Sequence, residues 1–265
     1  MAKQIFIFKD PFGNDAKYLA YKLNGKTVFR KSTPPTKEQI NNDPAFHNVR
    51  MNNQEFAAAA TLSKAIRNPQ VKESFQNFKD TYMSGRLTGV CRKIIQEGSG
   101  NLGKREACLV TNGIALEQFP LNKTRPLNYT LQTPYKLQTT PNRDTITLNT
   151  SISKKGLSGQ PKSTTHAQLI MTLSLVSKHQ FNAKTKKYLP KHPKQNAIGT
   201  TIHSEHIPIS KTPIPIQLEA KLPITEPLEK TTAIVVALGI TFGDLVNNTI
   251  YKLYTANAMN IIKIL

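Results

Sequence analysis

The sequence DPAFHNVRMNNQEFAAAATLSKAIR, residues 43–67, carries the clearest helix signal of the chain. Asp43 can cap the first turn, and Pro44 stands where a missing N–H costs nothing. Asn68 precedes a proline and therefore disfavours the α region, which ends the helix. Four consecutive alanines and no glycine lie between these two signals, so helix propensity is high. We predict a helix over residues 43–67, and the rest of the chain is interpreted outward from it.

The apolar residues of this predicted helix fall into two stripes. The first stripe consists of Phe46, Val49, Phe56 and Ala60, and the second, displaced around the helix, consists of Ala59, Leu62 and Ile66. Two stripes favour contacts on two sides of the helix, so we expect Phe56 to be buried. The polar side chains between the stripes are expected to cap or pin a neighbouring hairpin rather than bind a ligand; they are Asn52, Asn53 and Glu55.

Further elements are predicted on both sides of this helix. Residues 18–32 contain two alternating runs around Asn24-Gly25, which is typical of a tight β-hairpin. A second helix is expected from residue 69, because helical spacing is kept by Val71, Phe75, Phe78 and Tyr82. A third is expected over residues 84–96, ended by the glycines that follow, with inward residues Leu87, Cys91, Ile94 and Ile95. Residues 1–106 are thus predicted to form a β-hairpin plus a three-helix module.

From residue 107 the helical period disappears, and short runs rich in Thr and Ile alternate with turn residues. Candidate strands cover residues 107–117, 128–131, 145–150, 167–177, 199–209, 215–222, 232–241, 249–254 and 258–264. The run AIVVALGI at 233–240 predicts a buried central strand that includes Gly239 and leads to Phe242, and Asn247-Asn248 predicts a tight turn. This spacing favours an antiparallel, immunoglobulin-like β-sandwich over residues 107–265, so the predicted fold class is α+β.

Basic residues greatly outnumber acidic residues in this chain. It has 36 Lys and Arg residues against 16 Asp and Glu residues, which gives a net charge of +20. This balance implies attraction to polyanions, for which nucleic acid, an acidic protein and an anionic surface are candidates, and it says nothing about the fold.

The cysteine content and the apolar runs bear on the compartment. The two cysteines, Cys91 and Cys108, are too few for a disulfide framework. Two reduced thiols are preferred over a single bridge. The N-terminal apolar run is too short for a signal-peptide core, and no run reaches the roughly eighteen residues of a membrane span. We therefore expect a cytoplasmic protein without a membrane span.

Residues 98–105, GSGNLGKR, match the pattern G-x-G-x-x-G and also G-x-x-x-x-G-K. A phosphate-binding loop of either kind follows a strand and opens a helix, whereas here a helix precedes and a strand is expected to follow. The residue after Lys104 is Arg105, where the nucleotide motif needs Ser or Thr. A flexible connection is therefore the preferred interpretation, in which Lys104 and Arg105 can still bind an anion nonspecifically.

A second basic segment spans residues 178–196 and contains no acidic residue. Its lysines can each neutralise a phosphate, which gives affinity that depends on salt and ignores sequence. Aromatic residues suited to stacking on bases are few, Phe181 and Tyr188 only. The segment is interpreted as a loop, and a solvated loop without a ligand remains the alternative. Its lysines are Lys178, Lys184, Lys186, Lys187, Lys191 and Lys194.

Catalytic and metal-binding patterns are weak. His203 and His206 would point to opposite faces of a strand, so that they cannot share one ion, and no cysteine completes a zinc set. An enzyme would have to rely on His166, His203, Glu205 and His206, for which the sequence offers no supporting geometry. We predict no catalytic residues, no metal, no cofactor and no enzymatic activity.

Several short motifs follow one another along the chain: DPAF at 43–46, NNQEF at 52–56, GKR at 103–105, TH at 165–166, LGITF at 238–242, VNN at 246–248, YKL at 251–253 and NAMNI at 257–261. In this order they resemble the motifs of an uncharacterised family of Bacteroidota proteins. The chain departs from the pattern at Arg50-Met51, where the family has an Arg-Glu pair, and at Asn248, which replaces a glycine. The family brings no known activity, so the resemblance supports the fold and implies no function.

Two functions are consistent with these patterns. The first is a non-enzymatic binding or assembly protein, because apolar strands continue to Leu265 and such ends can complete a neighbour's sheet, either of an unknown protein partner or of a second copy. The second is a nucleic-acid-associated protein that uses its net charge and the lysine segment to bind phosphate backbones. We expect the first over the second.

Overall fold

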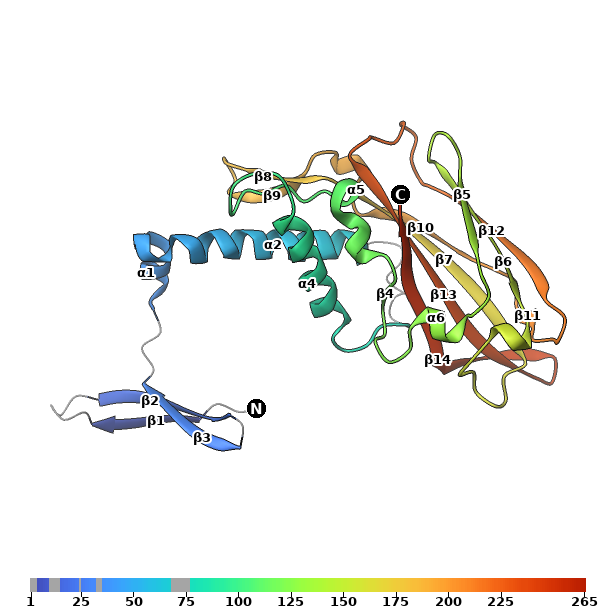
Figure 1. Cartoon of the computed structure of the whole chain (residues 1–265), viewed down its shortest axis with the longest axis horizontal. Coiled ribbons are helices and arrows are strands. Elements are labelled where there is room, and N and C mark those ends of the chain that lie inside the picture. Colours follow the sequence, from blue (N-terminus) through green and yellow to red (C-terminus); the bar gives the residue numbers. More distant parts are fainter. Residues whose placement is uncertain (1–3, 10–14, 24, 32–34, 68–76) are drawn as a thin grey trace. The chain divides into compact units, whose positions relative to one another are not determined.

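A computed structural model describes residues 4–9, 15–23, 25–31, 35–67 and 77–265 (Figure 1). The chain forms two compact units, Met1–Arg50 and Met51–Leu265. The fold is α+β, with an N-terminal hairpin, a helical module and antiparallel sheets. Among the described helices, none has both the length and the apolar composition needed to cross a bilayer. The predicted boundary at residue 106 stays a prediction.

The first unit begins with an antiparallel sheet in the order β1-β2-β3, formed by Gln4–Lys9, Asp15–Leu23 and Lys26–Lys31. The predicted hairpin is β2–β3, in which Leu23 pairs with Lys26 and Gly25 has a φ of 78°. A two-residue turn with positive φ suits the twist of the flanking strands. Strand β1 was not predicted and extends the hairpin to three strands.

Helix α1, Lys37–Asn42, begins with a capping box. Gln39 N–H donates to Thr36 Oγ1, and Thr36 N–H donates to Gln39 Oε1. Asp43 then accepts a hydrogen bond from Ala45 N–H at 2.8 Å and caps the 3₁₀ turn η1, Pro44–Phe46. Helix α2 follows directly, His47–Arg67. The helix predicted over 43–67 is therefore confirmed, with a first turn of 3₁₀ type.

The prediction that α2 is contacted on two sides is wrong. Its buried face holds Glu55, Ala59, Leu62 and Ile66, at the spacing of a single stripe. The other stripe faces outward, since Phe56 is 55% exposed and Val49 is 42% exposed. Asn52 is half-buried and Asn53 is exposed, and Phe46 is half-buried. Burial is decided by which stripe meets the sheet, and an amphipathic pattern alone does not identify that stripe.

Helix α4, Met83–Gln96, corresponds to the predicted third helix, and its residues Leu87, Cys91, Ile94 and Ile95 are fully buried. Most of the predicted second helix, residues 69–76, lies outside the described residues. Its last part, residues 77–82, forms turns, in which Phe78 is buried and Tyr82 is 77% exposed. For those six residues the helix prediction is wrong.

The main sheet has the order β10-β7-β13-β14-β4, and all its pairs are antiparallel. Its strands are β4 Phe119–Pro120, β7 His166–Ser177, β10 Ile198–His203, β13 Thr232–Val246 and β14 Thr249–Ile264, with β11 Ile207–Pro208 paired to the start of β7. Two predicted strands thus merge into β14. Asn247 and Asn248 form the predicted turn between β13 and β14, both with positive φ.

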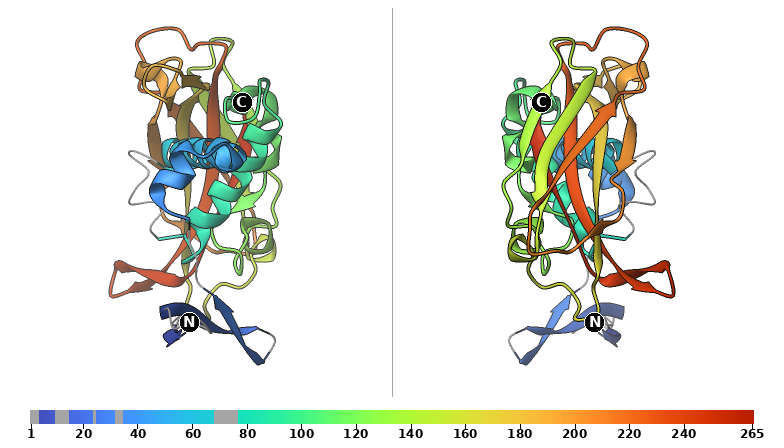
Figure 2. Two further views of the ribbon diagram at one scale, coloured as in Figure 1. Left: turned by 90° about the vertical axis from the view of Figure 1, so that its left-hand side faces the viewer. Right: turned by 90° about the vertical axis from the view of Figure 1, so that its right-hand side faces the viewer.

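A smaller antiparallel sheet has the order β12-β6-β5, formed by Ile214–Lys221, Thr145–Ile152 and Lys136–Thr139. It faces one side of the main sheet, because Ile146, Leu148 and Leu218 share a core with Leu169 and Met171 of β7. The opposite side of the main sheet packs on the helices (Figures 1 and 2). Strands β7 and β13 are buried on both faces, which explains why their sequences are largely apolar instead of alternating between apolar and polar residues.

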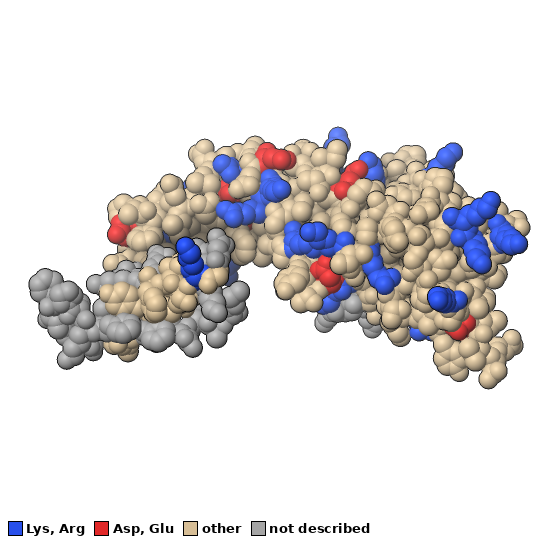
Figure 3. All heavy atoms as spheres, turned by 60° about the horizontal axis from the view of Figure 1, so that its bottom comes forward, with Lys and Arg blue, Asp and Glu red and all other residues tan. Residues whose placement is uncertain are grey.

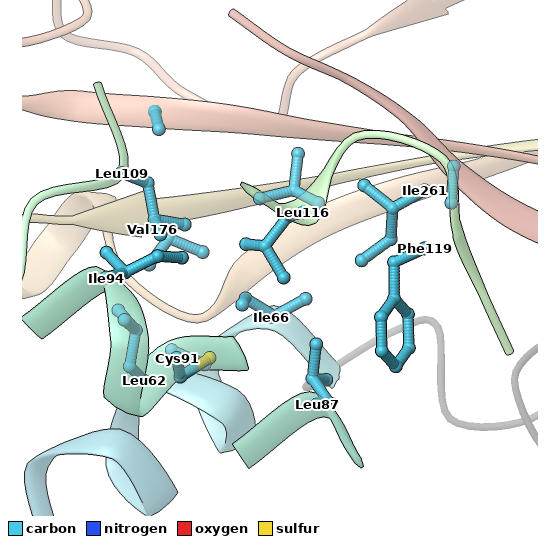
Figure 4. Packing of buried hydrophobic residues seen from close by; sticks show 14 of the residues in the cluster. Leu62, Ile66, Leu87, Cys91, Ile94, Leu109, Leu116, Phe119, Val176 and Ile261 are labelled. Atoms are coloured by element: carbon cyan, nitrogen blue, oxygen red, sulfur yellow. The ribbon is translucent and has the colours of Figure 1, made fainter. Parts of the chain in front are cut away.

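Figure 4 shows the core between the helices and the main sheet. Leu62 and Ile66 of α2 and Leu87, Cys91 and Ile94 of α4 point towards strand side chains such as Val176 and Ile261. Close packing continues at Gly239, where a Cβ atom would lie 2.6 Å from Met259 Cε and 3.2 Å from Phe78 Cζ. Phe242, on the other face of β13, is 2% exposed in the core between the sheets.

Two predicted strands are helical turns instead. Residues 107–117 form α5, Leu109–Asn112, and η2, Gly113–Leu116, where a Cβ on Gly113 would lie 2.9 Å from Ile264 Cγ2. Residues 128–131 lie largely within α6, Leu127–Thr130, whose first N–H donates to Asn260 Oδ1 at 2.9 Å. Both apolar runs are too short for periodicity to separate strand from helix, and contacts with β14 decide the outcome.

Candidate anion-binding hairpin

Residues 179–190 form a β-hairpin, so the prediction of a loop over residues 178–196 is wrong for this part of the segment. Strands β8, His179–Asn182, and β9, Lys187–Pro190, are antiparallel, and Phe181 lies opposite Tyr188. The two rings meet edge to face at 5.6 Å. Asn182 Oδ1 accepts from Thr185 N–H at 3.0 Å, and Lys186 has a φ of 53°, which closes the turn. A short 3₁₀ turn η4, Pro193–Gln195, follows the hairpin.

The base of the hairpin is fixed to the segment after α4. Ala107 and His179 exchange two backbone hydrogen bonds, each 2.9 Å long. His179 is completely buried, and its Nδ1 lies 2.9 Å from the carbonyl oxygen of Ser177. Burial lowers the pKa of His179, so the ring is neutral near pH 7 and Nδ1–H donates to that carbonyl.

Glu106 ties the glycine-rich loop to the hairpin. Its carboxylate lies 2.6 Å from Lys178 Nζ and accepts hydrogen bonds from Ser99 Oγ at 2.8 Å and Gln180 Nε2 at 2.9 Å. The hydrogen bonds from Lys178 and Ser99 lower the pKa of Glu106 to about 2. The carboxylate is therefore ionised throughout the neutral range and is satisfied by its own neighbours.

Glu55 fixes the same loop to helix α2. It is 1% exposed, and its Oε1 accepts from Gly103 N–H at 2.8 Å, while Arg105 Nη1 lies 3.5 Å from its Oε2. Tyr188 Oη donates to the Gly103 carbonyl at 3.2 Å, and burial raises the pKa of Tyr188 to about 12. Gly103 has a φ of 81°, a conformation that glycine adopts readily. Helix α2, the glycine-rich loop and strand β9, which are distant in sequence, thus meet at Gly103.

These contacts bring the two predicted basic segments together. Lys104 Nζ lies 6.0 Å from the centre of the Phe181 ring, so the loop lysine stands beside the hairpin. Lys184, Lys186 and Lys187 are exposed on and next to the turn. We call these four lysines the basic hairpin surface. Of the nearby carboxylates, Glu55 is buried and Glu106 is partly exposed, and both are already paired, with Arg105 and Lys178 respectively. These pairs leave the four lysines of this surface without a carboxylate partner among the described contacts.

The remaining predicted basic residues have other positions. Arg105 and Lys178 pair with the two internal carboxylates, and Lys194 pairs with Glu226 at 3.0 Å. Lys191 is exposed beyond the end of β9. On the face drawn in Figure 3, basic side chains are spread in several groups rather than gathered in one patch. The basic hairpin surface is therefore a local feature of a generally basic molecule.

The glycine-rich loop lacks the geometry of a nucleotide site. It follows helix α4 and leads into the four-residue helix α5. Gly103 N–H, the kind of donor that would bind a phosphate, is bonded to Glu55. The loop therefore acts as a connection that Glu55 and Glu106 hold against the hairpin.

The histidines considered in the sequence lie at the other end of the main sheet. His203 ends β10, while Glu205 and His206 lie between β10 and β11, outside any strand. Within the described ranges, no three His, Cys, Asp or Glu residues are grouped as ligands for a metal ion.

The sequence patterns do not indicate Glu106 and His179 as parts of the site, and they indicate Tyr188 only as a residue that could stack on bases. Their roles depend on contacts between segments about 70–85 residues apart, such as Gln180 with Glu106 and Tyr188 with Gly103. One signal was available for Glu55, because it lies four residues before Ala59 on the stripe that proved to be buried. Comparisons with known protein families, with curated proteins and with solved structures returned no match for this chain.

Proposed function

We propose that this protein is a non-enzymatic binding protein, and that its basic hairpin surface contacts the phosphate backbone of nucleic acid without reading sequence. The observation that carries the proposal is the position of Lys104 beside the hairpin that bears Lys184, Lys186 and Lys187, while the adjacent carboxylates are paired with Arg105 and Lys178. Each lysine that meets a phosphate releases counterions and adds affinity of a kind that falls with salt.

The form of the surface favours backbone contacts over contacts with bases. Tyr188 is buried, and Phe181 is half-buried between Tyr188 and Lys104. Neither ring offers the open face on which an unpaired base would stack. We therefore expect binding without sequence preference, and at least as tight for duplex as for single-stranded DNA, because the duplex has the higher charge density.

Reversing the charge of the hairpin tests this proposal. Replacing Lys184, Lys186 and Lys187 with Glu should weaken DNA binding by at least tenfold at low salt, because three phosphate contacts are lost and become repulsive. The slope of log K against log salt concentration should fall in magnitude by about 2–3, at about 0.9 per phosphate. Fluorescence anisotropy with labelled duplex and single-stranded DNA at two salt concentrations measures both quantities.

A matched control separates the surface from overall charge. Lys154, Lys155 and Lys162 are also exposed, and they lie in the connection between β6 and β7. Replacing these three with Glu changes the net charge by the same amount, and it should affect binding much less. Equal losses in the two triple variants would show that only net charge matters, and an absence of binding at low salt would refute the proposal.

Assembly through strands is a second candidate function. The predicted route through the C-terminus is disfavoured, because Leu265 exchanges backbone hydrogen bonds with Ile234 and β14 completes the sheet of its own chain. A different element is suited to assembly. Strand β13 pairs with β7 as far as Gly243, which lies opposite His166, the first residue of β7. The end of the β13–β14 hairpin, residues 244–251, continues beyond this point (Figure 2). We call it the arm.

The arm presents apolar side chains and a free backbone edge. Leu245, Val246 and Tyr251 are 42%, 45% and 57% exposed. On its outer side, β14 pairs with β4 only at Asn260 and Ile261 in the described part of the chain. Such an edge can pair with the same edge of a second copy about a two-fold axis, which makes a second copy the favoured occupant.

The oligomeric state tests this second function. Light scattering coupled to size exclusion should show a dimer whose fraction rises with protein concentration, and replacing Leu245 and Tyr251 with Ser should give a monomer. The substitutions lie at exposed positions, so thermal unfolding should change little. A strict monomer at all concentrations in the unchanged protein would exclude assembly through the arm.

The wider expectations also remain proposals. The proposal of an immunoglobulin-like β-sandwich over residues 107–265 is supported by two antiparallel sheets that share one core. The proposed resemblance to a Bacteroidota family rests on the sequence motifs given above. A cytoplasmic location is supported by Cys91 and Cys108, which are both buried and free of disulfide bonds.

A further inference from the structure

A polar cavity of about 240 Å³ lies at the end of the main sheet where the predicted histidines are found. Its walls come from β7, β10, β13 and β14 and from Asn77, and no residue of α2 or α4 contributes. Gln168 and Ile170 of β7 alternate with Leu169, whose side chain belongs to the core between the sheets. The cavity therefore opens on the face of the main sheet opposite to the smaller sheet.

The wall of this cavity is rich in hydrogen-bond donors and contains no carboxylate among the described residues. One lysine, one histidine, three carboxamides and a phenol line it, together with a threonine and two aliphatic side chains. A lysine and amide N–H groups favour oxygen atoms that carry negative charge. The polar groups used here are Asn77, Gln168, His203, Lys252, Tyr254 and Asn257.

The local electrostatics point the same way. Burial and then the Lys252 ammonium lower the pKa of His203, and burial, Lys252 and His166 lower the pKa of His206. The positive charge of Lys252 is thus felt by two imidazoles at this end of the sheet. Glu205 is the one carboxylate that acts against this effect on His206, and it does not line the cavity.

One wall group is also left without a partner. Asn257 is 5% exposed, and its side-chain oxygen has no hydrogen bond to any described residue. A buried acceptor of this kind is unusual unless a donor completes it, such as a bound water or the O–H of a protonated phosphate, so this oxygen does not itself attract an anion. The cavity volume of about 240 Å³ suits a small molecule rather than a polymer.

We propose that this cavity binds a small oxyanion, the carboxylate or phosphate group of a low-molecular-weight ligand, with Lys252 as the charge partner and His203 as a hydrogen-bond donor. The site is separate from the basic hairpin surface, because none of its lining residues belongs to β8, β9 or the glycine-rich loop. It does not depend on the proposed binding of nucleic acid.

An NMR titration of the full chain tests the site. Inorganic phosphate and acetate are added in separate experiments at constant ionic strength, with chloride as the background anion. We expect saturable shifts of the amides of β7, β10 and β14 around the cavity with at least one of the two probes. The probe that saturates at lower concentration identifies the preferred group, phosphate or carboxylate.

Variants of lysines on one strand give the decisive comparison. Lys252→Ala should weaken the binding by about tenfold or more, which is the loss of one charge-assisted contact. Lys263→Ala serves as the control, because Lys263 is also on β14 but pairs with Glu117 outside the cavity. His203→Gln should weaken binding to a smaller extent, since Gln can still donate a hydrogen bond.

The proposal is overturned by any of three results. The first is a lack of saturable shifts with both probes. The second is an equal affinity in Lys252→Ala and the unchanged protein. The third is loss of binding when Lys184, Lys186 and Lys187 are replaced with Glu, which would place the anion on the hairpin. Retained binding in that triple variant supports the cavity and leaves the nucleic-acid proposal to its own test.

Discussion

Replacing Glu55 with Ala is expected to lower the free energy of unfolding by about 3 kcal/mol. The substitution removes the acceptor of the buried Gly103 N–H and the ion-pair partner of Arg105. An unsatisfied buried donor costs about 1–3 kcal/mol, and breaking a buried charge pair costs about 3–5 kcal/mol. The lower part of the combined range applies because Arg105 is 27% exposed and can reach water. Urea titration monitored by circular dichroism measures the change.

Two comparisons identify the cause of this loss. Glu55→Gln keeps an acceptor for Gly103 N–H and loses the ion pair, so it should cost less than Glu55→Ala. Phe56→Ala removes a larger side chain from the neighbouring position, but Phe56 is 55% exposed and the cost should stay below about 1 kcal/mol. If Glu55→Ala is no more harmful than Phe56→Ala, the buried carboxylate does not stabilise the fold.

The contrast between Glu55 and Phe56 also shows how far the sequence determined the fold. Caps and propensity located α2 correctly, because Asp43, Pro44 and the alanine run act through local geometry. Orientation about the helix axis is a tertiary property. The stripe that includes Leu62 and Ile66 faces the sheet and takes Glu55 inside with it, while the aromatic stripe remains outside.

Strand prediction succeeded where a run was long and flanked by turn residues. Residues 233–240 are buried throughout, as expected of a strand covered on both faces. The run at 107–117 is also largely apolar but forms two short helical turns, because α5 packs against β13 and η2 packs against β14. The many lysines of residues 178–196 favour a loop in the sequence, and the two short strands that pair Phe181 with Tyr188 are not evident from it.

The sequence predicts which basic residues belong to the candidate site, but it does not predict that the two segments that carry them lie side by side. Lys104 and Arg105 are indicated by the glycine-rich motif at 98–105, and the lysines of residues 178–196 by the absence of acidic residues within that segment. Their meeting depends on Glu55 and Glu106, whose partners are distant in sequence. A single sequence does not reveal such pairs, because neither carboxylate stands within a helix turn or strand step of the residue it contacts.

Gly98→Ala is expected to lower the free energy of unfolding by about 3 kcal/mol or more, at least as much as Glu55→Ala. A Cβ atom at this position would overlap the carbonyl oxygen of Glu106 and lie 3.0 Å from the carbonyl oxygen of Ile95. Both obstacles are backbone atoms, so no side-chain rotation relieves the clash, and overpacking of this kind costs about 1–3 kcal/mol or more. The shift would also displace Glu106, which holds Lys178 and Ser99.

Gly89→Ala is the matched control for Gly98, with the opposite expected sign. Gly89 lies within α4, is exposed, and has no atom within 4 Å of the position that a Cβ would occupy. Alanine in the middle of an exposed helix is favoured over glycine by about 0.8–1 kcal/mol, so this variant should be more stable than the unchanged protein. In urea titrations under one set of conditions, the free energy of unfolding should be lower for Gly98→Ala and higher for Gly89→Ala than for the unchanged protein. If Gly98→Ala instead falls on the stable side together with Gly89→Ala, the backbone at residue 106 does not press against Gly98, and the tight connection between α4 and the hairpin is refuted.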